Sequence, residues 1–574
     1  MRKTEFYVDY NLYDTTALED GTPESTSNAA FADIDLLKDN PAAGVYATLE
    51  HNFFVLDGGR EEFPDAPDDL AYFSAGQSGD TGEFSQGQSV TVQFTENHTS
   101  IGITLHFLEE YPLELKIEWY DLAGAKKTEA TFYPDSPDYF CENQVEEYGK
   151  IVITFVETLP RHNVKLQYIE YGTTLTWGSD AVTSGKLTND TDPISDKIKT
   201  DKLTFDFVDR NEEFNIGNIS GLHKTFQKRQ KMLPYEVIDG VRMPLGVFFL
   251  DSNSTTKNVS KMSAIDFKGM LSNTDFKDGQ IYEGVKAGMI IDAIMDTAGI
   301  SDYVVDDETY NTLLYGTLKI QTCQKALREV LFACGSTVNT AMRENLEIHK
   351  SNRLISAKIE RSRKFSTTLQ TDHYVSDVNV KYTTWTLSEE VSQITKGTYG
   401  VGLHTIQLSN PAANMTTNIG TIIKQSPYYV ELQIDTDARA DVVISGQKYV
   451  GEELAVLSSI ENIKSGEVRS TKTFTGTLLD YEAAQRVADS ILDYYQLQQI
   501  IQTQHISQGE KAGDWIEVEN TLVGRGNFVA CIESLSTDLT GGFLGTAKYR
   551  GYYKLLSDYY YTGEIYSGED VGII

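Results

Sequence analysis

The stretch Leu113–Trp119, which reads LELKIEW, alternates between apolar and charged side chains. Successive side chains of a β-strand point to opposite faces, so the apolar set faces one side and the charges face the other. An α-helix would spread the same apolar residues around its surface. The stretch therefore predicts a strand with one buried face, and it predicts that Trp119 lies in a core.

Four neighbouring stretches carry a similar alternation and are separated by turns rich in Gly, Asn and Asp. Short strands at this spacing are typical of a β-sandwich. We therefore predict a sandwich over residues 47–172. The four additional strands are Ser89–Phe94, Ile101–Phe107, Lys150–Phe155 and Val164–Gly172.

A second β region follows over residues 173–276. Lys202–Asp209 is predicted as a strand, and Asp239-Gly240 is typical of a tight hairpin turn. The stretch Met243–Asp251 reads MPLGVFFLD, and a further strand closes on Asp266. These features predict a small antiparallel barrel or sheet, in which Gly246 lies where a side chain would obstruct a neighbouring backbone.

Residues 277–352 change to a helical period. Two apolar stripes, one from Val285 to Ala298 and one from Ala326 to Cys334, are each followed by a glycine, so each predicts a helix that ends there. A hairpin over residues 336–350 completes a small α+β module. A strand follows over residues 373–387, then a long polar stretch without a predicted element. A helix over residues 480–498 and closing strands complete the chain.

The chain has 49 Lys and Arg against 84 Asp and Glu, a formal net charge of −35. A surface this acidic repels phosphates, which disfavours sequence-specific nucleic-acid binding and binding to anionic lipid. The basic run His223–Lys231 is predicted to be a solvated strand face. No apolar run is long enough for a membrane anchor, and the N-terminus does not resemble a secretion signal.

No motif in the sequence carries catalytic chemistry. The nine histidines occur singly, and His98 and His106 are predicted to be unrelated solvated rings rather than ligands of one site. The four cysteines lack metal-ligand spacing and are predicted to be core residues, with Cys141 the least implausible nucleophile. The acidic loop Asp65–Asp69 remains a weak alternative as a Ca²⁺ site. We predict no catalytic residue, no metal and no cofactor.

Aromatic side chains beside polar loops are the remaining binding signal. Sugar rings present apolar C–H faces that stack on aromatic rings, while polar groups read the hydroxyls. The candidate glycan contacts, all in the predicted sandwich, are Tyr72, Tyr120, Tyr133 and Tyr139.

The order of segments after residue 172 resembles the tail-hub proteins of phages and phage-derived tail particles from Gram-positive bacteria. The resemblance rests on four elements in sequence: KLTFDF, DGVRMPLGVFFLD, SAIDFKGML, and a helix–helix–hairpin module that ends in RENLEI. A YEAA helix, AGDWIEV and TGGF follow. The first third is similar to the galactose-binding-like jelly roll inserted near the start of some hubs, with Glu5–Tyr13 as a strand of the hub.

The resemblance implies a mainly β multidomain protein: hub β-barrel modules, a small α+β module and an inserted jelly-roll sandwich. The divisions are an N-terminal hub strand and loop (1–46), the sandwich (47–172), the first hub module (173–276), the α+β module (277–352) and the second hub module (353–574). No C-terminal lysin domain of enzymatic hubs is recognisable, which favours a non-enzymatic member.

The same resemblance implies a homotrimeric ring that closes the distal tail tube of a virion assembled in the bacterial cytoplasm. Its partners would be tail-tube, distal-tail or baseplate proteins and a tape-measure or spike protein, and its outward domain would touch cell-surface polysaccharide. Two alternatives remain open: a carbohydrate-binding adhesin without a role in a tube, and a cell-wall hydrolase.

Overall fold

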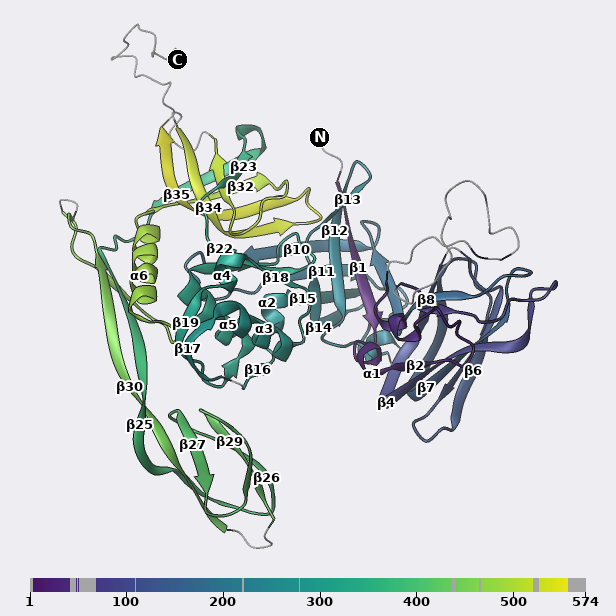
Figure 1. Cartoon of the computed structure of the whole chain (residues 1–574). Helices are drawn as coiled ribbons and strands as arrows, with labels where there is room; N and C mark the ends of the chain where they lie inside the picture. The colour runs from purple at the N-terminus through teal and green to yellow at the C-terminus, as the bar shows by residue number, and fades with distance from the viewer. Residues whose placement is uncertain are drawn as a thin grey trace.

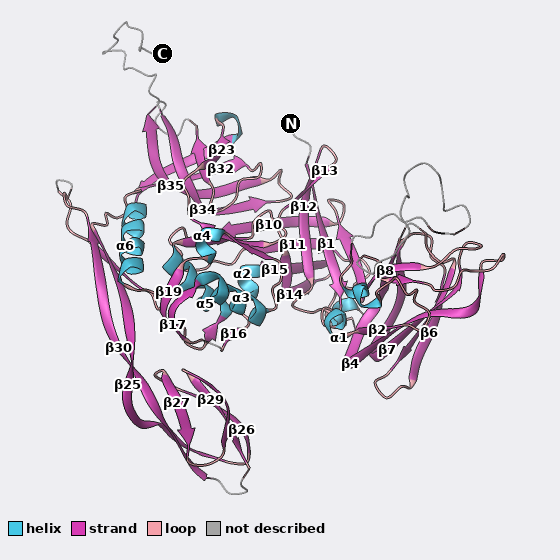
Figure 2. Cartoon of the chain, viewed as in Figure 1, coloured by secondary structure: helices cyan, strands magenta, loops and turns pink. Residues whose placement is uncertain are grey.

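The structure, a computed structural model, is mainly β and consists of several modules arranged around one long sheet (Figures 1 and 2). It describes residues 4–41, 48, 50, 69–108, 110–218, 221–277, 279–435, 440–463, 466–519 and 526–555. The predicted fold class, mainly β with a small helical module, is confirmed.

The central sheet has 14 strands and runs through two β modules without interruption. Its main path is β24-β32-β35-β34-β10-β11-β15-β14-β12-β1-β9, with β13, β33 and β23 paired beside it. The strands of the first β module are β1 (Thr4–Tyr13), β9 (Gly172–Trp177), β10 (Val182–Asp190), β11 (Lys202–Val208), β12 (Lys231–Ile238), β13 (Val241–Pro244), β14 (Phe248–Thr256) and β15 (Val259–Asp266). Those of the second β module are β23 (Ile355–Ile359), β24 (Lys364–Thr371), β32 (Gln499–Ile506), β33 (Trp515–Val518), β34 (Gly526–Asp538) and β35 (Leu544–Leu555).

Strand β10 connects the two β modules. It pairs with β11 on one side and with β34 on the other, so Leu187 lies opposite both Leu203 and Thr537. Leu187 also belongs to the core of the first module, together with Leu539 and Phe543 from the turn after β34. The two modules therefore share backbone hydrogen bonds and part of one core.

A unit built on one seven-stranded sheet, called the sandwich below after its predicted fold, is inserted into the first β module between two paired residues. Tyr13, the last residue of β1, lies opposite Gly172, the first residue of β9. The chain leaves the module at Tyr13 and returns at Gly172. The sandwich elements are α1 (Ala17–Asp20), β2 (Thr22–Glu24), the 3-10 helix Ile34–Lys38, β3 (Tyr72–Phe73), β4 (Glu83–Phe107), β5 (Glu114–Tyr120), β6 (Lys126–Phe132), β7 (Asp138–Glu157) and β8 (Lys165–Glu170).

Two predictions about the sandwich differ from the structure. The predicted strands Ser89–Phe94 and Ile101–Phe107 are the two halves of one long strand, β4, which bends at a register shift between Gln93 and His98. Ala17 and Leu37 were placed with the hub, but they pack in the sandwich core because the segment after Tyr13 already crosses to that side. Trp119 is fully buried in the same core, as predicted.

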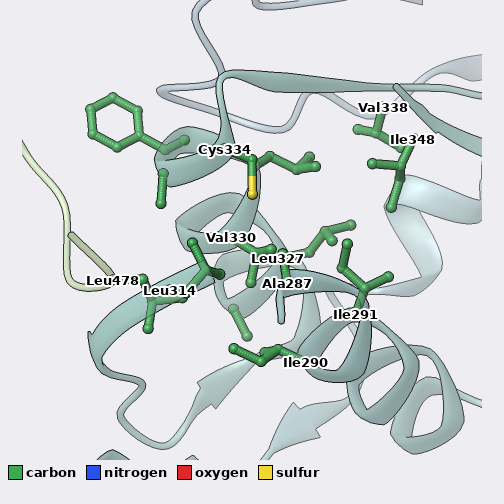
Figure 3. Packing of buried hydrophobic residues seen from close by; sticks show 14 of the residues in the cluster. Ala287, Ile290, Ile291, Leu314, Leu327, Val330, Cys334, Val338, Ile348 and Leu478 are labelled. Carbon is green, nitrogen blue, oxygen red and sulfur yellow. The ribbon is translucent and has the colours of Figure 1, made fainter. Parts of the chain in front are cut away.

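The helical module contains four helices and several short strands. The predicted helices are present as α3 and α5, and their closing glycines, Gly299 and Gly335, take left-handed φ values of 66° and 64°. Figure 3 shows their apolar stripes pointing into a shared core. The elements are α2 (Phe267–Met270), β16 (Asp275–Phe276), β17 (Ile281–Lys286), α3 (Ala287–Ala298), β18 (Tyr303–Val305), α4 (Asp307–Tyr310), β19 (Leu313–Thr317), β20 (Gln321–Thr322), α5 (Cys323–Cys334), β21 (Ser336–Asn339) and β22 (Leu346–Lys350).

Residues 377–459 form an arm that the sequence did not predict. Two long antiparallel strands, β25 and β30, extend away from α6 and carry a small β unit with its own core at their far end (Figure 1). The polar stretch after the predicted strand at residues 373–387 supplies most of this arm. The elements of the arm are β25 (Asp377–Tyr399), β26 (Gly402–Gln407), β27 (Ala412–Thr417), β28 (Thr421–Ser426), β29 (Tyr429–Ile434) and β30 (Ala440–Ser459). Strand β31 (Thr471–Thr475) and helix α6 (Tyr481–Tyr495), which was predicted, follow it.

Two local predictions have opposite outcomes. The Asp239-Gly240 turn joins β12 to β13 with φ values of 49° and 84°, as expected for a tight hairpin. The basic run His223–Lys231 is not a strand face: it begins in the 3-10 helix Leu222–Thr225 and continues as a turn that leads into β12. Lys224, Lys228 and Arg229 in this run are exposed, but Thr225 and Gln230 are buried, so the prediction of a solvated strand face is wrong.

Candidate functional site

A buried ionic cluster lies where the two β modules and the helical module meet. Lys268 Nζ is 2.9 Å from Asp201 Oδ1 and 3.3 Å from Asp266 Oδ2, and all three side chains are buried. Thr340 Oγ1 donates to Asp266 at 2.6 Å, and Asn189 Nδ2, at the end of β10, donates to Asp201 at 3.1 Å. Burial alone would lower the pKa of Lys268, but the two carboxylates outweigh it and raise this pKa.

This cluster also explains why a strand closes on Asp266 and turns directly into a helix. Asp266 Oδ1 accepts a hydrogen bond at 3.1 Å from the backbone N–H of Gly269 and thereby caps the N-terminus of α2. Its second oxygen faces Lys268. One residue therefore ends β15, begins α2 and neutralises a buried cation.

A second ionic contact lies in the sandwich, at the point where the chain enters it from the first β module. His98 on β4 is buried, with Nδ1 3.1 Å from Asp14 Oδ2 and Nε2 2.9 Å from Asp20 Oδ2. Because each ring nitrogen faces a carboxylate oxygen, both nitrogens carry a proton in this arrangement. The two aspartates follow β1, so a charged imidazole connects the β4 bend to the segment that enters the sandwich.

The pKa values at this contact shift in opposite directions. Burial disfavours the charged imidazole, but hydrogen bonds to Asp14 and Asp20 outweigh burial and raise the pKa of His98. Burial would raise the pKa of Asp14, but hydrogen bonds from His98 and Thr16 lower it to about 2. The contact is therefore strongest when His98 is protonated.

The prediction that His98 is a solvated ring is wrong. His98 follows a register shift of β4, and such bulges redirect side chains. Its partners lie 84 and 78 residues away in the sequence, so no local pattern could have identified them. His106, which is partly exposed, lies 2.7 Å from Asp138 and 3.2 Å from Glu170, a separate pair of carboxylates.

The four tyrosines predicted as glycan contacts lie in different environments. Tyr72 is buried, stacks on Phe155 with ring centroids 5.5 Å apart, and shares a 3.0 Å hydrogen bond with Ser27. A ring without an exposed face cannot stack on a sugar, so the inclusion of Tyr72 is wrong. Tyr139 is half-buried against the sandwich core.

The other two candidates are more accessible. Tyr133 is 63% exposed. One face of the Tyr120 ring is occupied by Lys150, whose Nζ lies 4.3 Å from the ring centroid, and the Tyr120 hydroxyl donates to Glu118 at 3.2 Å. Because Tyr72 is buried, the four rings cannot all contact one ligand, so the predicted set does not form a single site.

Residues with catalytic or metal-binding potential are dispersed in the described part of the chain. No three or more His, Cys, Asp or Glu side chains there are grouped to hold a metal ion. All four cysteines are buried free thiols, and burial raises the pKa of Cys141. The Asp65–Asp69 loop lies outside the described residues except for Asp69. No helix among the described residues meets the length and hydropathy needed to cross a membrane.

The main path of the central sheet ends in β9 and β24, and beside it β13 and β23 each pair with one strand only among the described residues. β9 pairs only with β1, and β24 pairs only with β32, along the described sheet path. Unpaired backbone groups on such edges are sites for pairing with another chain. Phe365, on β24, is 54% exposed.

No protein-family model and no curated protein sequence matches the chain. Among solved structures it is similar to a tail protein from Neisseria meningitidis MC58, with 11% identity and a TM-score of 0.39 over 64% of this chain and 92% of that one. It is also similar to the 43 kDa tail protein of prophage MuSo2 from Shewanella oneidensis, with 10% identity and a TM-score of 0.38 over 64% of this chain and 93% of that one. A third similar structure is prophage tail protein gp18 from Listeria monocytogenes EGD-e, with 8% identity and a TM-score of 0.37 over 66% of this chain and 91% of that one. At these identities and scores the likenesses establish neither family nor function.

Proposed function

We propose that this chain is a structural hub of a phage or phage-derived tail. Three copies form a ring that closes the distal tail tube, and the sandwich of each copy faces outward toward cell-surface glycan. The protein acts without catalysis and contacts tail-tube, distal-tail or baseplate proteins and a tape-measure or spike protein. It resides in the virion and is assembled in the bacterial cytoplasm.

The observation that carries this proposal is the continuity of the 14-stranded sheet across both β modules. A tube wall needs modules that lie side by side with fixed curvature. Strand β10 supplies this, because its hydrogen bonds to β11 and β34 prevent the two modules from rotating independently. The order of sequence segments that resembles tail hubs is an independent support.

The two end strands of the sheet support an assembly of identical copies. β9 belongs to the first module and β24 to the second, so pairing between copies would join unlike edges in a head-to-tail manner. Head-to-tail contacts generate a closed ring when the rotation between copies closes. Closure of the ring would also cover the edges that are open in a single chain.

The charge of the chain suits a conduit for DNA. With a formal net charge of −35, the protein offers few cations to a passing phosphate backbone. Phosphate binding depends on neutralisation by Lys and Arg, so an acidic wall does not retain DNA.

The test is the mass of the purified full chain in solution. We expect three times the 64.1 kDa mass of one chain, and the substitution Phe365→Lys on the edge strand β24 should shift the population toward monomer. Val468→Lys is the matched control, because Val468 is 80% exposed and lies outside the edge strands. A monomer at every concentration, or a trimer that neither substitution affects, would contradict the role given to this edge.

A low-resolution image of a particle tests the location separately. A central threefold ring at the tail tip is expected. A peripheral appendage would instead favour an adhesin without a role in the tube.

A further inference from the structure

A cleft of about 460 Å³ opens where the sandwich, the first β module and the helical module meet. We call it the junction cleft and define it by Asn11, Tyr13, Glu19, Tyr168, Arg229 and Asp302. Its volume is within the range of small-molecule sites, which occur preferentially at domain interfaces. No sequence pattern marked it, because its residues come from six separated segments.

Three tyrosines line the junction cleft, and two of them, Tyr13 and Tyr168, are partly exposed, whereas Tyr171 is buried. The Tyr13 hydroxyl shares a 2.6 Å hydrogen bond with Thr174, and the Tyr168 ring lies 5.5 Å from the His106 ring. These contacts hold the rings in place before any ligand arrives, which reduces the entropy lost on binding.

Gln230 lines the cleft, and both polar atoms of its side chain already make hydrogen bonds within the chain. Its Nε2 donates to the carbonyls of Tyr13 at 2.8 Å and Thr225 at 2.7 Å, and its Oε1 accepts from Tyr10 Oη and from Gln227 N. The side chain is buried. It fixes the end of β1, and therefore Tyr13, against the turn that carries Arg229.

Most charges in the cleft are already paired. Asp14 faces His98, Glu170 faces His106 at 3.2 Å, and Asp302 faces Lys231 at 3.3 Å. Arg229 and Glu19 are exposed and make no ion pair or hydrogen bond with the described residues. Arg229 and Glu19 therefore remain available to a ligand. One positive and one negative side chain together favour a ligand without net charge that is rich in hydroxyl groups.

We propose that the junction cleft binds an uncharged pyranose unit of a cell-surface polysaccharide. This inference rests on the proposed outward role of the sandwich and assigns its glycan contact to the cleft rather than to the separate tyrosines. The C–H face of the sugar stacks on Tyr168, since the negative π-face of the ring attracts the C–H groups. Arg229 donates to the sugar oxygens, and Glu19 accepts from its hydroxyls.

Saturation-transfer NMR on the full chain with glucose, N-acetylglucosamine and glucuronate as probes tests the inference. The wild type should bind the two uncharged sugars and bind glucuronate more weakly. Tyr168→Ala and Arg229→Gln should each weaken binding by about tenfold. Tyr168→Phe, which keeps the ring, and Tyr133→Ala, which alters an exposed tyrosine outside the cleft, should bind like the wild type.

Three outcomes would overturn the cleft as the site. These are no binding of either uncharged sugar, unchanged binding by both Arg229→Gln and Tyr168→Ala, or loss of binding in Tyr133→Ala. Because Arg229 is exposed, its substitution tests the site even if Tyr168→Ala fails to fold. The mass measured on the same sample separates the two proposals: a trimer without sugar binding removes only this inference, and a sugar-binding monomer removes only the ring.

Discussion

At the junction between the two β modules, strand β10 pairs on both sides, and Lys268 is enclosed by two buried aspartates. At the junction between the sandwich and the first module, the contacts differ in kind. The pairing of β1 with β9 ends at Tyr13 and Gly172, where the sandwich begins. Next to this point His98 forms ionic contacts with Asp14 and Asp20, and Asp14 lines a cleft. The first junction depends on sheet continuity and on a buried ion cluster, in which burial raises the pKa of Asp266 to about 6. The second depends on a histidine whose pKa is raised by its two carboxylate partners despite burial.

The difference indicates which part of the molecule is rigid. A continuous sheet cannot rotate at β10 without breaking backbone hydrogen bonds, which suits a wall. A junction held by a titratable side chain and lined by a cleft can change its strength with pH and with a bound ligand. Breaking one contact at each junction should therefore have unequal effects.

The largest effect is expected from Lys268→Met. The substitution leaves Asp201 and Asp266 buried without their cation, and removal of one partner from a buried ion pair costs about 3–5 kcal/mol in the free energy of unfolding. Hydrogen exchange of the peptides that contain β10 and β15 measures the loss. Lys261→Met is the control, because Lys261 is 55% exposed and 4.0 Å from Asp206, so it should change little. Equal effects of the two substitutions would contradict the role of the buried cluster.

A smaller, pH-dependent effect is expected from His98→Gln. The pKa of His98 is raised in the folded chain, so its stabilisation is fully present below the unfolded value of about 6.5 and is lost as pH rises through the folded value. At pH 6 the substitution should cost about 1.5 kcal/mol or more, the worth of hydrogen bonds to a charged group. At pH 9 the wild type and the variant should converge.

Calorimetry of the sandwich transition at pH 6 and pH 9 checks this prediction. His404→Gln is a suitable control, since His404 Nε2 contacts the backbone carbonyl of Gly400 at 2.8 Å rather than a carboxylate. A difference between wild type and His98→Gln that does not depend on pH would show that the ring acts through packing alone.

The smallest effect is expected from Lys224→Gln at the same junction. Lys224 lies 3.2 Å from Glu146 of the sandwich, but the side chains are 42% and 55% exposed. Exposed ion pairs contribute little, so the transition should change by less than about 0.5 kcal/mol at both pH values. If Lys224→Gln lowered the free energy of unfolding as much as His98→Gln does, the difference in burial would not explain how much each contact contributes to stability.

The local elements were predictable because their signals are local. The stripe that includes Leu327 and Val330, followed by Gly335, specified helix α5, and the alternation that includes Ile117 and Trp119 specified strand β5. The long arm was missed because a ribbon exposed on both faces carries no apolar alternation, as in the Thr-rich part of β25. The bend of β4 at His98 was missed because a bulge depends on the partner strand.

The sequence by itself determined the helices α3, α5 and α6, the strands with a clear apolar alternation, and the acidic net charge, since periodicity and charge are read from the residues themselves. Only the tertiary structure decided that β10 joins two modules into one sheet, that His98 meets two distant aspartates, and that Tyr13, Tyr168 and Arg229 share a cleft. These contacts join residues far apart in the chain, and their free energy depends on burial and geometry that arise only when the modules pack together.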